Sequence, residues 1–215
     1  MKNSSEKSKI KLNLGCGITL LEGFINVDKF IDYKELLKGS KSQNGLYQRA
    51  EVQPNAKFVK GDVLDLPFKD NYADYIESMD MIEHISIRDQ PQMFREFFRV
   101  LKPKGEIRLL TSDFNNLAQI WLSEIKDKPL NTQNYINIAE VIYGNQVGEG
   151  EVHRCPYTPE FISYLLAQAG FTDVRLALHP RFNQDSPDMA ILRGRIIQGG
   201  WRSDMLFVSA RKGTK

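Results

Sequence analysis

Short apolar runs alternate with helical spacing through the first half of the chain. The runs are rich in β-branched residues, and turn residues or amphipathic segments follow them, a pattern typical of a mostly parallel α/β sheet. The pattern predicts five strands in this order, over residues 10–14, 24–28, 56–62, 73–78 and 105–112. We therefore expect one central sheet built from these strands.

The clearest helix is predicted over 90–105. Asp89 can cap its start, and the segment from Lys102 to Gly105 can close it. One apolar stripe repeats at i, i+3, i+4 and i+7, and it consists of Phe94, Phe97, Phe98 and Leu101. We expect this stripe to pack on the sheet as core.

The second half begins with helical tendency over 115–143, followed by the glycine-rich link GNQVGEGE. We expect residues 114–157 to form a helical lid inserted after the fifth strand, which the link could allow to move. Thr158 and Pro159 then predict a helix that ends at Gly170. The last two strands are expected over 173–178 and 205–211.

Length and composition favour a single domain over 10–215, preceded by a disordered tail over 1–9. The net charge is only +2, so charge gives no strong nucleic-acid signal. The polar N-terminus lacks a signal-peptide core and no window resembles a membrane span, so we expect a cytoplasmic protein without a membrane partner. Cys16 and Cys155 lie far apart without metal-ligand spacing, and we expect reduced thiols and no metal.

The stretch KLNLGCGITLLEGFINVD, residues 11–28, has a glycine turn at Gly15 and Gly17 after an apolar run. Because glycine has no Cβ, the main chain can pass close to a ligand here. The third glycine of a dinucleotide motif is replaced by Leu20, which disfavours NAD. No lysine and hydroxyl residue follow as in a P-loop, which disfavours a triphosphate, and a purely structural turn remains an alternative.

Two aspartates end the next predicted strands. Asp28 could accept hydrogen bonds from both hydroxyls of a ribose, and Asp62 could accept one from an adenine amino group. Val63 would offer a backbone N–H and an apolar wall. Taken singly, Asp28 would be an ordinary aspartate at the end of a strand.

Five motifs in this order resemble those of class I S-adenosylmethionine (AdoMet)-dependent methyltransferases, and they are KLNLGCG, INVD, GDVLDLPF, DYIESMDMIEHI and FFRVLKPKGEIRLLTSD. The chain is most similar to a small bacterial predicted methyltransferase group of type 11. The resemblance implies a Rossmann-like fold with a seven-stranded, mostly parallel sheet and an antiparallel last strand. It also implies that AdoMet lies across the carboxyl ends of the strands, under a roof formed by the C-terminal half.

The same resemblance implies roles for residues at that edge. Gly15 and Gly17, with Cys16 between them, would back the methionine and ribose portion of AdoMet. Asp28 would bind the ribose, and Asp62 and Val63 the adenine. The far side of the cofactor would contact Ser78 and Met79.

The chain departs from the family pattern in two places. An acidic residue is common two positions before the first glycine, and this chain has Asn13, which can still bind a backbone amide or the cofactor's amino group without charge. The crossover from Gly17 to Asp28 is too short for a full helix. We therefore expect the first helix to be reduced to a turn.

Methyl transfer is an in-line displacement in which positioning contributes much of the rate, so a base is needed only for a protonated nucleophile. The candidates for catalysis are His153, His84 and Asp113, and those for substrate binding are Arg154 and Tyr157. Structural alternatives stay open: a helix-start role for His84, a surface-loop role for His153 and a helix cap for Asp113. An acidic substrate could also meet a group of arginines, namely Arg181, Arg193, Arg195 and Arg202.

The leading hypothesis is AdoMet-dependent methyl transfer to a small molecule or glycan precursor, with S-adenosylhomocysteine as the product. A catalytically silent AdoMet-binding or scaffolding subunit is the alternative, and methylation of protein or RNA ranks lower. The sequence leaves open the acceptor atom and the oligomeric state.

Overall fold

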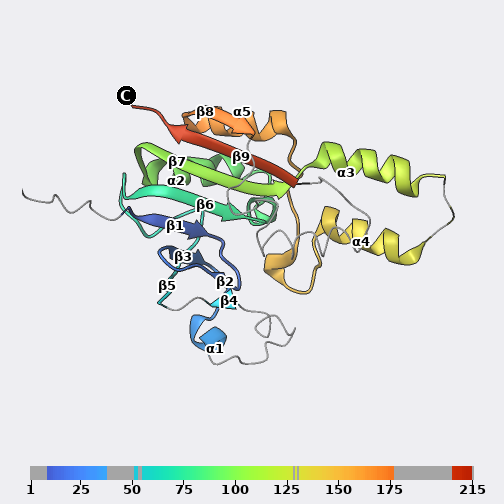
Figure 1. Cartoon of the computed structure of the whole chain (residues 1–215), viewed down its shortest axis with the longest axis horizontal. Coiled ribbons are helices and arrows are strands. Elements are labelled where there is room, and N and C mark those ends of the chain that lie inside the picture. Colours follow the sequence, from blue (N-terminus) through green and yellow to red (C-terminus); the bar gives the residue numbers. More distant parts are fainter. Residues whose placement is uncertain are drawn as a thin grey trace, which may run out of the picture.

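The protein is an α/β molecule built on one seven-stranded sheet (Figure 1). This computed structural model describes residues 9–37, 51–52, 55–127, 129, 131–176 and 205–214. In chain order the strands of the sheet are β1 (Lys11–Leu14), β3 (Ile25–Asp28), β5 (Lys57–Lys60), β6 (Ala73–Met79), β7 (Leu101–Ser112), β8 (Phe171–Leu176) and β9 (Met205–Lys212). Their spatial order is β5-β3-β1-β6-β7-β9-β8.

Pairing is parallel except at β9, which runs antiparallel to both β7 and β8. The expected sheet with an antiparallel last strand is therefore confirmed. The parallel strands β5, β3, β1, β6 and β7 all end at one edge, where a ligand of an open α/β sheet usually binds. The tail expected over 1–9 lies, apart from its last residue, outside the described residues.

The crossover from β1 to β3 contains no helix, as the short spacing predicts. Residues 15–24 hold only β2 (Thr19–Leu20), which pairs in parallel with β4 (Glu51–Val52). Two buried asparagines fix this loop. Asn13 donates its amide hydrogens to the carbonyl oxygen of Thr19 (3.1 Å) and to Oδ1 of Asn26 (2.9 Å).

Helices α2 (Gln90–Val100) and α5 (Pro159–Ala169) pack together on one face of the sheet (Figure 1). The aromatic stripe of α2 is core as expected, because Phe94 and Phe97 are fully buried. The helix ends at Val100, earlier than predicted. Leu101 already pairs with Ala73, so β7 begins four residues before the predicted strand.

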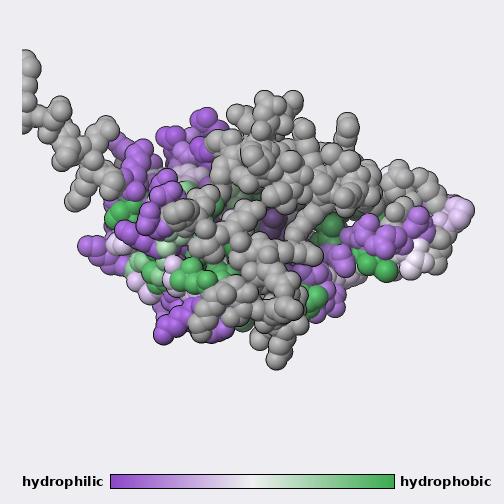
Figure 2. All heavy atoms as spheres, turned by 60° about the horizontal axis from the view of Figure 1, so that its bottom comes forward, coloured by the Kyte–Doolittle hydropathy of each residue, from purple (hydrophilic) through white to green (hydrophobic). Residues whose placement is uncertain are grey.

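The segment between β7 and α5 projects beyond the edge where the parallel strands end (Figure 1). It consists of α3 (Phe114–Ile120), the π-helical η3 (Trp121–Ile125), α4 (Thr132–Tyr143) and the short turn η4 (Glu149–Glu151). Trp121 and Tyr135 join its two arms by an edge-on ring contact. Apolar side chains such as Leu122 and Ile136 lie exposed on this projection among hydrophilic ones (Figure 2).

Two further short helices are α1 (Tyr33–Leu37) and η2 (Ile82–His84). Leu36 of α1 packs with Cys16 and Leu20 in a small second core beside the β1–β3 loop. This core covers a region that the missing crossover helix would otherwise cover. Among the described helices, none has the length and apolar character needed to cross a membrane.

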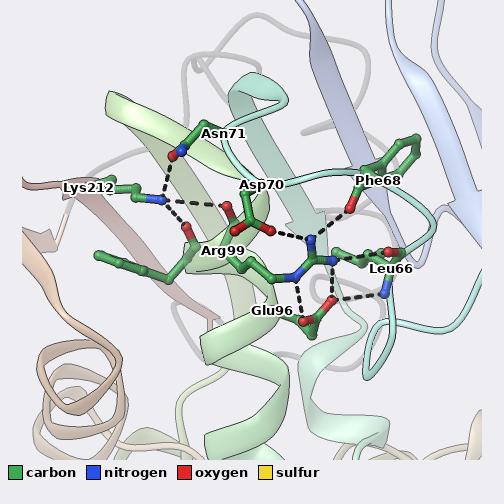
Figure 3. A network of polar contacts seen from close by, with 8 residues as sticks. Leu66, Phe68, Asp70, Asn71, Glu96, Arg99 and Lys212 are labelled. Carbon is green, nitrogen blue, oxygen red and sulfur yellow. Dashed lines mark hydrogen bonds and ion pairs between the residues drawn. The ribbon is translucent and has the colours of Figure 1, made fainter.

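A polar network near the carboxyl end of α2 joins this helix to the loop after β5 and to β9 (Figure 3). The Arg99 guanidinium binds the carboxylates of Glu96 and Asp70 and the carbonyl oxygens of Leu66 and Phe68. It thereby fastens the loop after β5 to α2. Nearby, the ammonium group of Lys212 on β9 donates to Asn71 (2.9 Å) and to the carbonyl oxygen of Phe98 (2.7 Å).

Candidate active site

The glycine turn lies at the carboxyl end of β1, with Gly15 at φ +65° and Gly17 at φ +50°. These angles favour glycine over residues with a Cβ. The two positions differ in their surroundings. A Cβ on Gly15 would lie 1.9 Å from Cγ of Met81, whereas a Cβ on Gly17 would meet no atom within 4 Å. The absence of a Cβ at Gly15 thus leaves room for the Met81 side chain, and Gly17 borders open space.

Cys16, between the two glycines, is buried in the small second core. Burial, followed by the nearby charge of Asp28, raises the pKa of its thiol well above the usual value. The thiol is therefore an inert packing group, and Cys16 can reach a ligand only through its backbone.

Asp28 closes the turn from the neighbouring strand. Its Oδ2 accepts the backbone N–H of Gly17 (2.9 Å), and its Oδ1 accepts those of Phe30 (2.8 Å) and Ile31 (3.1 Å). Because a carboxylate oxygen can accept two hydrogen bonds, Oδ2 keeps a lone pair for a ligand. Asp28 therefore shapes the turn and presents an acceptor at the same time.

Asp62 follows β5, the next strand outward. Its Oδ1 accepts the backbone N–H of Leu64 (3.0 Å), and its Oδ2 pairs with the ammonium group of Lys29 at 2.8 Å. Burial acts to raise the pKa of Asp62, but Lys29 and the Leu64 N–H outweigh it and hold this pKa below the usual value. Val63 is buried in the main core beside it.

The remaining residues expected at the cofactor include Ser78 and Met79 at the end of β6. Ser78 is fully buried, and its hydroxyl donates to the carbonyl oxygen of Leu14 (3.0 Å), which ties β6 to β1. Met79 is half-buried at the strand end. Asn13 uses both amide hydrogens within the β1–β3 loop, so its geometry is that of a structural clamp.

A second group of polar side chains lies on η2 and on the chain that precedes α5. The rings of His84 and His153 make an edge-on contact, with 4.7 Å between their centroids. Glu83 is buried beside them, and its backbone carbonyl accepts the N–H groups of Arg154 (2.7 Å) and Cys155 (3.1 Å). These backbone hydrogen bonds bring together two segments about 70 positions apart in the chain.

Burial shifts the pKa of each of these three side chains toward its neutral form. Burial and then the Asp80 charge raise the pKa of Glu83 to about 8. Burial also lowers the pKa of His84, although the carbonyl groups of Val152 and Asp80 act against it. The pKa of His153 falls to about 4 through burial and the neighbouring His84. The two histidine rings are thus partly shielded from solvent.

Two of the predicted site residues, Asp113 and Tyr157, make contacts that stabilise the fold. Asp113 caps α3, because it accepts the backbone N–H of Asn115 (3.0 Å) and the side-chain amide of Asn116 (3.0 Å). Tyr157 is almost fully buried, and its hydroxyl donates to Gln90. The structure does not bring either of them into the histidine group.

Arg154 is exposed, and its charge acts on the His84 ring. The segment between β7 and α5 also approaches the edge where the parallel strands end. A Cβ on Gly150 would lie 3.1 Å from the ring of Phe30, which follows Asp28 closely in the chain. The other arginines expected to meet an acidic substrate, Arg181, Arg193, Arg195 and Arg202, lie outside the described residues.

Three important residues were not singled out from the sequence, namely Asn26, Glu83 and Gln90. Asn26 bonds to Asn13 and to both backbone groups of Leu21. Gln90 donates to the carbonyl oxygens of Ile82 and Ile85 (2.9 Å each), which fixes η2. The available signal was a polar residue in an otherwise apolar stretch, as at Glu83 in MIEHI.

Comparison with known proteins gives consistent matches. Residues 12–109 match the sequence profile described as "Methyltransferase domain". Norajmaline N-methyltransferase of Rauvolfia serpentina is 30% identical over 121 residues, which cover 53% of this chain and 39% of that protein. The chain spans less than half the length of the curated relatives it matches.

Solved structures share the fold at low identity. A SAM-dependent methyltransferase from Methanosarcina mazei superimposes with a TM-score of 0.55 and 18% identity, covering 98% of this chain and 95% of its own. Phosphoethanolamine N-methyltransferase 2 of Haemonchus contortus, in complex with phosphomonomethylethanolamine and S-adenosylhomocysteine, has a TM-score of 0.55 and 16% identity. That match covers 99% of this chain and 50% of the other. The strand order and the glycine turn agree with the profile match over residues 12–109, so this part of the chain is similar to methyltransferase domains and the whole chain shares the fold of S-adenosylmethionine-dependent methyltransferases.

Proposed function

We propose that the protein transfers the methyl group of AdoMet to a small-molecule acceptor. The observation that carries this proposal is the convergence of Gly17, Asp28 and Asp62 at the carboxyl ends of three neighbouring strands. AdoMet has no phosphate, so it needs hydrogen-bond acceptors and close backbone approach rather than a helix N-terminus. The edge supplies both.

Each group at the edge has a proposed role. The open space beside Gly17 receives the methionine and ribose portion, and Oδ2 of Asp28 accepts a ribose hydroxyl. Asp62 accepts a hydrogen bond from the adenine amino group, which replaces the ion pair of Asp62 with Lys29. This exchange is inexpensive, because an ion pair with a side chain as exposed as that of Lys29 contributes roughly 0–1 kcal/mol. Val63 lines the adenine and Met79 the far side of the cofactor, whereas the fully buried Ser78 supports this edge through its hydrogen bond to Leu14.

The acceptor is proposed to bind under the lid, near His153 and His84. Methyl transfer breaks the bond from carbon to the sulfonium sulfur as the acceptor attacks from the opposite side, so orientation contributes much of the rate. Of the three residues first considered for catalysis, the two histidines remain candidates, because Asp113 is a helix cap; the buried Tyr157 is likewise a weak candidate for substrate binding. The exposed Arg154 beside them could hold an acidic group of the acceptor.

Two observations favour a small organic acceptor. The relatives and neighbours include methyltransferases named for norajmaline and phosphoethanolamine. The lid also exposes apolar side chains, among them Leu122 and Ile136, that an organic molecule could contact. The alternative of a catalytically silent subunit was motivated by Asn13 and by the absence of an obvious catalytic base, and the structural contacts of Asn13 weaken the first of these two motivations.

Transfer of labelled methyl tests the proposal. The protein is incubated with methyl-labelled AdoMet and a panel of small hydroxyl and amine compounds, with protein and RNA pools in parallel. We expect S-adenosylhomocysteine and a labelled small product to appear in equal amounts. A protein that binds AdoMet yet labels none of the panel, or labels only protein or RNA, would contradict the proposal.

A further inference from the structure

Glu83, His84 and His153 form a group of side chains with the donor atoms and the spacing of a metal-binding site. Each residue places one potential donor atom within 4.8 Å of the donor atoms of the other two. The set contains two imidazole nitrogens and one carboxylate oxygen. Three-ligand zinc sites of enzymes use this same combination.

Both imidazoles are oriented by the main chain. Nδ1 of His84 lies 3.2 Å from the carbonyl oxygen of Val152, and Nδ1 of His153 lies 2.9 Å from that of Val141. Because a carbonyl oxygen only accepts, the contact of His153 assigns its hydrogen to Nδ1. His84 has the carbonyl groups of Val152 and Asp80 beside it, and the tautomer with the hydrogen on Nδ1 satisfies the contact with Val152. In the neutral ring Nε2 then carries a lone pair. Metal-binding histidines characteristically have such an outer hydrogen bond.

The carboxylate is an independent sign of a missing partner. Oε2 of Glu83 has no hydrogen-bond partner within 3.5 Å among the described residues, and the residue is only 3% exposed. The buried Thr111 hydroxyl lies beside this carboxyl and acts to lower its pKa, but it too makes no hydrogen bond within that distance in the described part of the chain. A buried polar atom without a partner is costly, and a bound cation would satisfy it. The nearby negative charge of Asp80 also favours a cation at this position.

We propose that Glu83, His84 and His153 bind a divalent first-row transition metal ion, with Zn²⁺ the best match to the donor set. At zinc bond lengths of roughly 2.0 Å, tetrahedral donors lie about 3.3 Å apart. Binding would therefore draw the three side chains together by up to about 1.5 Å. Small rotations of the two rings and of the Glu83 side chain accommodate this change.

The proposed ion would also define the acceptor, an inference that rests on the proposed function. Three protein ligands leave one coordination position open. An oxygen of the acceptor, from a hydroxyl or carboxyl group, can occupy that position beneath the lid. Met81 packs on Gly15 two residues before Glu83, so the metal group and the cofactor turn are joined by a short rigid segment. The acceptor class is then an oxygen-bearing small molecule.

Zinc binding tests the site. The chain without an affinity tag is stripped with a chelator, and Zn²⁺ uptake is measured by calorimetry and elemental analysis on the wild type, H84A, H153A and E83Q. The chain has three histidines, so H179A serves as a matched control that removes the third. Circular dichroism shows which variants fold.

We expect one equivalent of Zn²⁺ in the wild type and in H179A. Affinity should fall by about 100-fold or more in H84A and H153A, since loss of even an outer partner costs roughly 10- to 100-fold. No stoichiometric uptake by the wild type, or uptake unchanged in folded H84A and H153A, overturns the proposal.

If the histidine variants fail to fold, Co²⁺ bound to the wild type gives the answer. Visible absorption bands of a low-coordinate Co²⁺ centre are expected, and the weak spectrum of hydrated Co²⁺ overturns the proposal. AdoMet binding to the chelator-treated wild type is measured separately. Loss of that binding counts against the proposed function, whereas loss of Zn²⁺ binding counts only against the metal site.

Discussion

At the residue scale, Gly17 is the position where stability and cofactor binding separate most cleanly. Its φ is +50°, but a Cβ there would touch no protein atom. We expect G17A to lower the free energy of unfolding by only about 1–2 kcal/mol, the usual cost of a left-handed alanine. Because the methyl group would enter the proposed cofactor space, AdoMet affinity should fall at least about tenfold, or 1.4 kcal/mol.

A matched control is available at Gly23, which also has a positive φ (+75°) but lies away from the cofactor edge. Its nearest neighbour would be the Lys11 ammonium group at 3.7 Å, an ordinary contact. G23A should therefore show a similar loss of stability in urea unfolding and unchanged AdoMet affinity in calorimetry. Equal loss of affinity in both variants would refute the assignment of Gly17.

Asn13 gives a second prediction. Replacing Asn13 with aspartate would place a buried carboxylate against two acceptors, the Thr19 carbonyl oxygen and Asn26 Oδ1. We expect N13D to destabilise the protein by about 2 kcal/mol, since two buried hydrogen bonds are lost. The loss should shrink at low pH, where the new carboxyl group is protonated and can donate. An N13D variant as stable as the wild type at pH 7 would contradict the clamp.

A physical reason separates the residues that could be predicted from the sequence from those that could not. Asp28 and Asp62 were recognisable because a strand end fixes their position at the sheet edge. The roles of Asn13, Asn26 and Glu83 depend on partners that tertiary packing supplies, and no local pattern specifies such partners. Tyr157 shows the reverse case, because its hydroxyl reaches Gln90 across 67 positions of sequence and the side chain is used in the core.

At the element scale, the polar network near the carboxyl end of α2 predicts how the stability of the fold depends on pH. Arg99 holds the pKa of Glu96 below its usual value, chiefly through their hydrogen bonds. A depressed pKa in the folded state stabilises the fold above the unfolded-state pKa, and this contribution disappears as the pH falls through the folded-state pKa. E96Q should therefore be less stable than the wild type at pH 7.

The gap between the wild type and E96Q should close as the pH falls from about 5 toward 3. Urea unfolding at several pH values measures it. A matched control is E140Q, because Glu140 is an exposed glutamate on helix α4, away from this network. A gap between E96Q and the wild type that stays constant with pH would show that Arg99 does not hold the Glu96 charge.

Elements were easier to predict than contacts. The order of strands followed from apolar runs, and the absence of a helix between β1 and β3 followed from the ten residues that separate Gly17 from Asp28. The early start of β7 at Leu101 was missed because pairing with Ala73 overrides the turn character of Lys102 to Gly105. The π-helical η3 has no local sequence signal.

At the scale of the whole molecule, the β1 turn and the lid approach each other in two ways. Met81 connects Gly15 to the histidine group, and Gly150 of the lid packs near Phe30. A ligand at the cofactor edge would therefore contact segments from both halves of the chain. This arrangement explains how the cofactor and an acceptor could be held side by side.

The most direct measurement is calorimetric titration of AdoMet into the wild type, D28N and D32N. Asp28 Oδ2 accepts the Gly17 N–H at the proposed cofactor edge, whereas Asp32 caps the start of α1 through the N–H groups of Lys34 and Glu35. Asparagine caps nearly as well as aspartate. We predict binding at one site in the wild type and D32N, with affinity at least about tenfold weaker in D28N. Wild-type protein that binds no AdoMet, or folded D28N that binds it as tightly, would contradict the assignment of the cofactor edge.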